Sequence, residues 1–282
     1  MACSIYDLDA AALEAARAQI DTWLAAKLPA GAAAPALASV AFCADLGQCL
    51  HGAELVIENV PEPLELKRRV FAEIDLLAPA GAVLATNSSS LPASRIASAT
   101  RRPERVVNVN FGNPPEDELL VELMAAECVP REVSDSVETF LSDIGTVPIV
   151  SRREIMGFSF NRVWRAIKRE CLHLVGDGVS HFEDLDRAWI LTFETRRGPF
   201  GMMDVIGLDV VLDIERQYFQ GSGEERDRPP EFLQRMVDNG RLGVKSGRGF
   251  YSYPSPEYEA LGWLRKETPW TGDRRLAPVS EL

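Results

Sequence analysis

The sequence lacks the marks of several protein classes. None of its apolar runs approaches the ~18 residues that a membrane-spanning helix needs, and its first residues show no basic-then-apolar signal pattern. Its five cysteines form no C-x-x-C pair, so we expect neither a disulfide framework nor a zinc or other metal site. The odd number of cysteines favours a reducing, cytoplasmic compartment, and we expect no membrane partner.

Basic residues are also scarce. The chain has 30 Lys and Arg against 42 Asp and Glu, and its net charge of −12 repels phosphate backbones and excludes general nucleic-acid binding. Any anionic ligand therefore needs a local basic pocket. The composition, with 46% hydrophobic and 26% charged residues, is typical of a globular protein, and the length of 282 residues suits two domains.

Apolar strands alternate with helices over the first half of the chain. Residues 3–7, 40–43, 53–60, 82–86, 106–111 and 147–150 read as strands, 8–27 and 63–78 as helices, and the Ala/Pro-rich stretch 29–38 as a loop. This alternation predicts a parallel sheet covered on both faces. From residue 157 the pattern is helical alone. We therefore expect an α/β, Rossmann-like, mostly parallel sheet in residues 1–150 and an all-α domain in residues 151–282.

Four groups of motifs carry a family resemblance. They are 56–67 (VIENVPEPLELK), 86–91 (TNSSSL), 108–115 (NVNFGNPP) with 120–122 (LVE), and 157–162 (GFSFNR) with 198–200 (GPF), 204–208 (DVIGL) and 243–251 (GVKSGRGFY). In this order they resemble the 3-hydroxyacyl-CoA dehydrogenase family, 3-hydroxybutyryl-CoA dehydrogenases included, and residues 161–186 are also similar to its lambda-crystallin and gulonate dehydrogenase branch. The resemblance implies an NAD-binding domain and a helical domain that forms a homodimer.

The resemblance implies four contacts to NAD, from Asp7, Glu62, Lys67 and Asn87. Asp7 matches the acid that bonds the adenosine ribose, because a carboxylate suits a diol. Its alternative role is a helix N-cap. Glu62 and Lys67 match positions near the nicotinamide end, and a solvated helix face is the alternative for Lys67.

Four other residues match catalytic positions. Ser89 matches the serine that bonds the substrate's 3-oxygen, and Asn161 the asparagine that holds the reacting carbonyl; both are neutral donors suited to developing oxyanion charge. Alternatively, the serines around Ser89 cap the next helix and Asn161 bonds backbone. Glu122 matches the carboxylate that orients a catalytic histidine, and the position of that histidine is occupied by Asn110.

Asn110 is the first departure from the family. A histidine titrates near neutral pH and takes the 3-hydroxyl proton, whereas an amide has no usable basicity, so the usual hydride transfer should slow by ~10²–10⁴ or more. None of the chain's histidines is placed to substitute; they are His51, His173 and His181. Arg165 and Lys168 share a helix face with Asn161. If that face points into the site, Lys168 could act as the base, as a lysine does in a different dehydrogenase family. The alternative is that these residues form a solvated helix face, which explains the same spacing.

The second departure is a missing glycine turn. A Rossmann domain opens with a strand and a G-x-G-x-x-G turn that holds the pyrophosphate, but no such turn precedes Asp7, and the run 243–249 follows a helix. The opening strand of a Rossmann domain lies at the centre of its sheet. A sheet without this strand would leave the backbone groups of the two neighbouring strands unpaired. We therefore expect about 25–30 further residues, a strand and a helix, before Met1. The chain as it stands is expected to bind NAD weakly.

Three functions are compatible with these residues. The first, which we favour, is NAD-dependent interconversion of 3-hydroxyacyl and 3-oxoacyl thioesters, carried by CoA or an acyl carrier protein, or of a related 3-hydroxy acid. The second is a redox-inactive relative that binds an acyl thioester or performs non-redox chemistry, such as enolisation, cyclisation or hydration, with Glu122 as the base. Asn110 and the missing turn favour this second function. The third is a structural, crystallin-like role.

Overall fold

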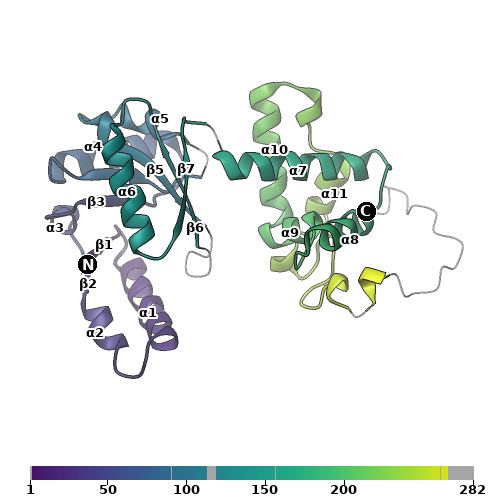
Figure 1. Cartoon of the computed structure of the whole chain (residues 1–282), viewed down its shortest axis with the longest axis horizontal. Coiled ribbons are helices and arrows are strands. Elements are labelled where there is room, and N and C mark those ends of the chain that lie inside the picture. Colours follow the sequence, from purple (N-terminus) through teal and green to yellow (C-terminus); the bar gives the residue numbers. More distant parts are fainter. Residues whose placement is uncertain (1, 90, 113–118, 156, 261, 266–282) are drawn as a thin grey trace, which may run out of the picture. The chain divides into compact units, whose positions relative to one another are not determined.

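The chain folds into two compact units in a computed structural model, Met1–Ser159 and Phe160–Leu282 (Figure 1). The structure describes residues 2–89, 91–112, 119–155, 157–260 and 262–265. Unit 1 combines strands and helices, whereas the secondary structure of unit 2 is helical. Among the described residues, no helix combines the length and the apolar character needed to cross a membrane.

Unit 1 holds seven strands and six helices among its described residues. In chain order they are β1 (Cys3–Tyr6), α1 (Ala10–Lys27), α2 (Ala33–Ala38), β2 (Val40–Cys43), α3 (Leu46–Leu50), β3 (Leu55–Glu58), α4 (Leu64–Leu77), β4 (Val83–Thr86), α5 (Ala93–Ala97), β5 (Val106–Phe111), β6 (Leu120–Ala125), α6 (Arg131–Asp143) and β7 (Val147–Ser151). The prediction of a loop over 29–38 is wrong because α2 forms there. Its Pro35 stands in the first turn, where a missing N–H costs no helical hydrogen bond.

The strands form two sheets rather than one. A two-stranded sheet pairs β1 with β2, and a five-stranded sheet has the order β3-β4-β5-β6-β7. Among the described residues, β3 has β4 as its only strand neighbour and β1 has only β2. All pairs are parallel except β5 with β6, which are antiparallel. The mostly parallel, Rossmann-like fold is therefore confirmed, and the simpler expectation of a wholly parallel sheet is wrong at β5 and β6.

Each face of the five-stranded sheet packs on its own helices. One face, which we call the α5 face, carries Val56, Leu84 and Val106 and packs with side chains of α4 and α5. The opposite face packs under α6, which lies across the sheet in Figure 1, and we call it the α6 face. Because side chains alternate along a strand, every second residue of β5 points to the same face. Asn108 and Asn110 therefore share the α5 face with Val106.

Unit 2 is built from five helices among its described residues. They are α7 (Ser159–Gly176), α8 (Phe182–Phe193), α9 (Pro199–Ile206), α10 (Leu208–Ser222) and α11 (Glu231–Asp238), of which α7 begins at the last residue of unit 1. Their core includes Leu172, Phe200, Leu212 and Phe250. The all-α expectation for this half of the chain is confirmed.

Two buried aspartates organise the glycine-rich motifs of unit 2. Asp186 is 0% exposed and accepts the N–H groups of Phe200 and Gly201 at the start of α9. Asp204, also 0% exposed, accepts the N–H groups of Phe250 and Tyr251 at 2.9 Å. Burial raises the pKa of both carboxyls to about 6, against the opposing effect of these backbone donors.

The glycines of these motifs leave room for the aspartates. A methyl group on Gly249 would lie 2.0 Å from Asp204 Oδ1, and one on Gly198 would lie 2.4 Å from Asp186 Cγ. Neither neighbour can retreat without breaking its hydrogen bonds to backbone. The motifs at 198–200, 204–208 and 243–251 therefore serve the packing of unit 2 and not a phosphate-binding turn.

We predict that Gly249→Ala lowers the free energy of unfolding by about 3 kcal/mol, because the added methyl overpacks a buried carboxylate. Chemical denaturation measures the change. Gly221→Ala is the matched control, since Gly221 lies in α10 with no atom within 4 Å of an added methyl group. That substitution should stabilise by about 0.5–1 kcal/mol. Equal effects of the two substitutions would contradict the assignment.

Candidate functional site

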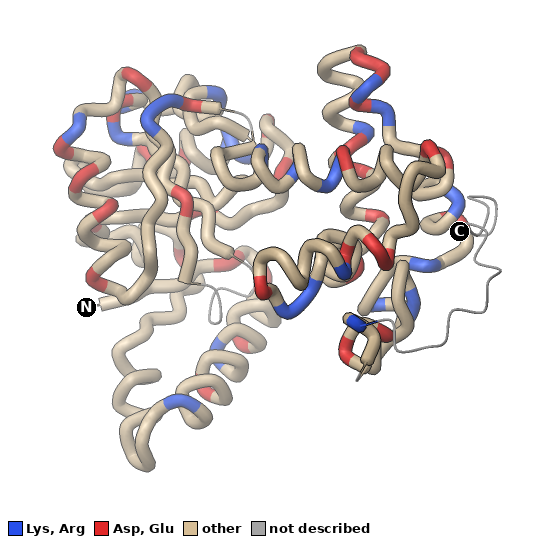
Figure 2. Tube along the Cα trace, turned by 45° about the vertical axis from the view of Figure 1, so that its right-hand side comes forward, with Lys and Arg blue, Asp and Glu red and all other residues tan. Residues whose placement is uncertain are grey.

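The strands of unit 1 carry only two charged residues, Glu58 in β3 and Glu122 in β6. Figure 2 shows the contrast with the helices, where acidic and basic residues are interspersed. Both glutamates are buried, with exposed fractions of 4% and 3%. A buried carboxylate is costly unless it is paired, so each one requires a specific surrounding.

Glu58 begins a row of polar side chains across the sheet. It stands opposite Thr86 of β4, which stands opposite Asn108 of β5, and both of these are 0% exposed. Glu58 Oε2 accepts the hydroxyl of Thr86 at 2.7 Å, and Thr86 Oγ1 accepts the N–H of Ser88 at 3.2 Å. The row ties the ends of the central strands to the loop that follows β4.

Lys67 neutralises this row from α4. Its ammonium lies 2.8 Å from Glu58 Oε1 and 3.5 Å from Glu62 Oε2, and it donates to the carbonyl of Val60 at 2.9 Å. Only 1% of Lys67 is exposed, so the alternative of a solvated helix face is wrong for this residue. The structure thus joins Glu62 and Lys67, two of the residues predicted to contact NAD, in one ion-pair network.

The loop after β4 is held at several points. Asn108 Oδ1 accepts the N–H of Ala93 at 2.6 Å, and its amide donates to the carbonyl of Leu91 at 2.9 Å. Ser88 Oγ accepts the N–H of Leu91 and donates to Glu62. Ser88 therefore fixes a turn, while the adjacent Ser89 is exposed and forms no hydrogen bond with the described residues.

Asn87 links three strand ends. Its amide donates to Asn59 Oδ1 at 2.7 Å beyond β3, and its carbonyl oxygen accepts the N–H of Phe111 at 2.9 Å at the end of β5. Its own backbone N–H donates to the carbonyl of Glu58. The observed contacts of Asn87 are thus structural, and its contact with NAD stays a prediction.

Asn110 and Glu122 face each other across β5 and β6. They are register partners in the antiparallel pair, so their side chains lie on the same face, the α5 face. Cβ atoms of such partners are about 4.5–5.5 Å apart. The sequence predicted that these positions act together, and the structure brings them together with Glu122 buried and Asn110 half-buried.

Asp7 follows the carboxyl end of β1 and is exposed. It is not the N-cap of α1, since that role belongs to Asp9, which accepts the N–H of Ala11. Asp7 Oδ1 instead accepts the N–H of Asp9 at 2.9 Å. A carboxylate at the end of a parallel strand fits the ribose end of NAD, whereas the sequence offers no glycine-rich turn for the pyrophosphate.

Asn161 lies in the first turn of α7, within unit 2, and is half-buried. Farther along this helix, Arg165 and Lys168 are 9% and 2% exposed, so the solvated-face interpretation of these positions is wrong. Arg165 pairs with Glu215 at 3.0 Å, and Lys168 Nζ lies 3.5 Å from the same carboxylate. Burial lowers the pKa of Lys168, and Glu215 opposes this shift.

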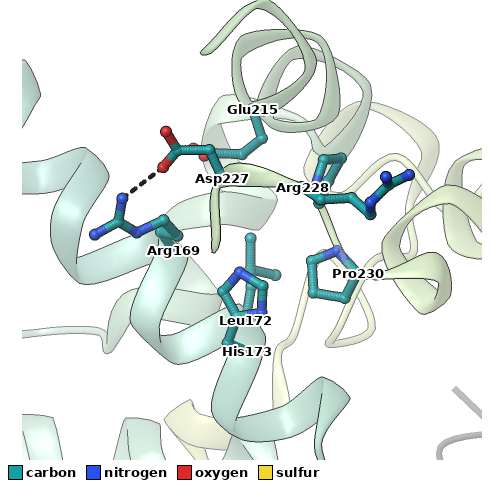
Figure 3. Close-up of a pocket in the computed structure, with 8 residues that line it drawn as sticks. Arg169, Leu172, His173, Glu215, Asp227, Arg228 and Pro230 are labelled. Carbon is teal, nitrogen blue, oxygen red and sulfur yellow. Dashed lines mark hydrogen bonds and ion pairs between the residues drawn. The ribbon is translucent and has the colours of Figure 1, made fainter. Parts of the chain in front are cut away.

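Unit 2 also contains a shallow pocket (Figure 3). It is lined by Arg169, Leu172, His173, Glu215, Asp227, Arg228, Pro229 and Pro230. Figure 3 shows the ion pair of Arg169 with Asp227, at 2.6 Å. Burial opposes ionisation of Asp227, but Ser222, Arg169 and Arg165 outweigh it and lower the pKa of Asp227 to about 2. The pocket includes none of the predicted site residues. Of its other charged residues, Glu215 pairs with Arg165 and Lys168, and Arg228 pairs with Glu225.

The polar row of Glu58, Thr86 and Asn108 was not predicted from the sequence. A pattern could have revealed it, because each is a polar residue within an otherwise apolar strand. Once the register of the strands is known, the alternation of side chains shows that such residues share one face of the sheet. The register itself depends on long-range pairing, which the sequence does not display.

The chain matches a family in both halves. Residues 1–155 match the model for the 3-hydroxyacyl-CoA dehydrogenase NAD binding domain, and residues 157–253 match the model for the C-terminal domain of the same family. A curated relative is 5-formyl-3-hydroxy-2-methylpyridine 4-carboxylate 5-dehydrogenase of Mesorhizobium japonicum. It is 30% identical over 261 residues, which cover 91% of this chain and 84% of that protein.

Further relatives agree with this match. The 3-hydroxybutyryl-CoA dehydrogenase of Mycobacterium tuberculosis is 35% identical over 219 residues, which cover 77% of this chain and 76% of that protein. The crystal structure of (S)-3-hydroxybutyryl-CoA dehydrogenase from Ralstonia eutropha superposes with a TM-score of 0.82 at 27% identity. That superposition covers 90% of this chain and 91% of the other.

We predict that Lys67→Met lowers the free energy of unfolding by about 3–5 kcal/mol, since it leaves the buried charge of Glu58 unpaired. Denaturant unfolding measures the loss. Arg131→Met is the matched control, because Arg131 forms an ion pair with Asp135 while its side chain is 88% exposed, and its loss should cost less than about 1 kcal/mol. Equal costs for the two substitutions would contradict the role of Lys67.

Proposed function

This chain belongs to the 3-hydroxyacyl-CoA dehydrogenase family, and we propose that it is an NAD-dependent oxidoreductase that interconverts 3-hydroxyacyl and 3-oxoacyl thioesters or a related 3-hydroxy acid. The observation that carries the proposal is the pairing of Asn110 with Glu122 on one face of the sheet. The loop that bears Ser89 is held on the same face by Asn108. The thioester is carried by CoA or by an acyl carrier protein.

The roles of the residues follow from their chemistry. The exposed hydroxyl of Ser89 donates to the substrate's 3-oxygen, and Asn161 of unit 2 donates to the reacting carbonyl. Glu122 takes the hydroxyl proton directly or through a water molecule, because the amide of Asn110 has no usable basicity and positions the substrate instead. NAD, when bound, supplies the hydride acceptor. Asp7 would hold its ribose, with Glu62, Lys67 and Asn87 toward the nicotinamide end.

The two halves of the chain divide these tasks. We assign NAD binding and the substrate contacts of Ser89, Asn110 and Glu122 to residues 1–150, and dimerisation and the substrate contact of Asn161 to residues 151–282. We place the protein in the cytoplasm, which is consistent with its five free cysteines.

A second candidate is a redox-inactive relative that binds an acyl thioester or uses Glu122 as the base of a non-redox reaction. One observation favours it, the amide at position 110. Absorbance of reduced nicotinamide on mixing the protein with NAD and 3-hydroxybutyryl-CoA separates the oxidoreductase from the other candidates, and calorimetry with NAD alone and with butyryl-CoA alone separates this relative from a structural role. Binding of butyryl-CoA without NAD supports this relative, whereas binding of neither supports a crystallin-like structural role.

We predict that Asn110→His raises kcat with NAD and 3-hydroxybutyryl-CoA by about 10²–10⁴-fold, because imidazole restores a base opposite Glu122. Absorbance of the reduced nicotinamide measures the rate. Asn110→Gln is the matched control, since it keeps an amide and should bring no gain. An unchanged rate in Asn110→His would contradict the assignment of position 110.

We further propose that the chain forms a homodimer through unit 2. Large apolar side chains are exposed on three consecutive helices of this unit: Leu191 and Phe193 on α8, Met202 and Val205 on α9, and Val210 on α10. Leu191 and Phe193 are each 59% exposed. Monomers rarely expose large contiguous apolar surfaces, so these exposed side chains support an interface on unit 2.

Sedimentation should therefore give about twice the chain mass of 31.1 kDa. The double substitution Leu191→Ser and Phe193→Ser should return the protein to the mass of one chain. The matched control is Leu76→Ser on α4, a residue of unit 1 that is 66% exposed. A monomeric parent protein, or a dimer that survives the double substitution, would contradict this interface.

A further inference from the structure

The candidate site continues beyond Glu122 onto the edge strand β7. Glu122 is the register partner of Ile149, as it is of Asn110 on its other side. Register partners point to the same face of a sheet, so the three side chains form one row across β5, β6 and β7 on the α5 face. Adjacent strands lie about 4.8 Å apart, so Ile149 is a direct neighbour of Glu122 in the sheet.

A second row lies beside the first. Leu120 is the register partner of Val147, and both stand two residues from the Glu122 row on the same face. Val147 is 51% exposed and Ile149 is 42% exposed, although Glu122 on the neighbouring strand β6 is 3% exposed. We call Leu120, Val147 and Ile149 the apolar strip.

The covering of the α5 face ends next to this strip. Ser151, the next residue of β7 on that face, is 8% exposed and bonds to Ser159 at 2.8 Å. The segment between them bonds to α5 and to β6, through Glu154 with Ser94 at 2.8 Å and Ile155 with Met124 at 3.1 Å. The sheet face is thus covered up to Ser151 and open at Ile149.

We propose that the apolar strip binds the hydrocarbon part of the substrate's acyl chain, and so sets a preference for chains longer than four carbons. The inference rests on the proposed function, because it requires the 3-oxygen of the substrate to lie at Asn110 and Glu122. From that point an acyl chain that runs along the same sheet face meets Ile149 and then Val147. A short or polar substrate would leave both side chains in contact with water.

The energetics favour an acyl chain over water at this strip. Each buried methylene contributes about 0.8 kcal/mol, a factor of about four in affinity. Octanoyl-CoA has four more methylenes than butyryl-CoA. Because the strip contacts one side of the chain, we expect about half of the full effect, which is about a tenfold tighter dissociation constant.

Calorimetry with the 3-hydroxy derivatives of butyryl-CoA and octanoyl-CoA, which carry the 3-oxygen that the inference requires, tests it on the full chain. The parent protein should bind the octanoyl derivative about tenfold more tightly, and Ile149→Ser and Val147→Ser should each remove most of that preference. Val150→Ser is the matched control, because Val150 lies on the same strand, is 41% exposed and points to the α6 face. It should keep the full preference.

Three other outcomes overturn the inference in different ways. If the preference for the octanoyl chain survives Ile149→Ser and Val147→Ser, or if Val150→Ser removes it equally, the apolar strip does not bind the acyl chain. The proposed function is not affected by either result. A change in sedimentation mass on Ile149→Ser identifies the strip as a contact between two copies of the chain. If neither thioester binds the parent protein, the proposed function fails as well.

Discussion

The ion pair of Glu58 with Lys67 is the constraint on which the candidate site depends. Removing two charges from water costs several kcal/mol per ion, which is recovered only if the geometry and the remaining hydrogen bonds are satisfied. Here Glu58 accepts from Lys67, Thr86 and the N–H of Val60. These bonds fix the ends of β3 and β4, and through Thr86 and Ser88 they fix the loop beyond. This buried network therefore positions the loop that carries Ser89.

The chain departs from the pattern of its family at position 110, where the resemblance implies a histidine and the sequence has an amide. Glu122, the register partner of Asn110, is then the one carboxylate of the pair, and it is 3% exposed. The same arrangement of strands therefore supports either a slow oxidoreductase or a base acting on the carbon next to a carbonyl.

The architecture followed from the sequence to a large extent, because apolar strands and amphipathic helices have distinct periods. The strand over Val40–Cys43 and the strand over Val106–Phe111 agree with the structure at both ends. The antiparallel β6 was not predicted as a strand, because its neighbours in sequence gave no helix to separate it from β5. Helix α2 was missed because alanine and proline together are typical of loops.

The sequence predicted which residues of the candidate site lie together, but it did not predict which charged residues are buried. Spacing along the chain suggested that Asn110 and Glu122 act together, and their pairing agrees with this. The sequence did not predict the burial of Lys67, Arg165 and Lys168, because charged residues on helices are usually exposed. Lys67 pairs with Glu58, nine residues earlier in β3, whereas Arg165 and Lys168 pair with Glu215 from a distant part of the chain. Such partners become visible only when the fold brings them together.

The antiparallel pairing of β5 with β6 has an evolutionary consequence. Parallel neighbours need a crossover of a dozen or more residues, whereas antiparallel neighbours can follow one another directly. Asn110 and Glu122 consequently stand twelve positions apart in the chain while lying opposite each other in space. One exchange of the segment 106–125 between related genes would transfer Asn110 and Glu122 together, and strands β1 to β4 would remain those of the recipient.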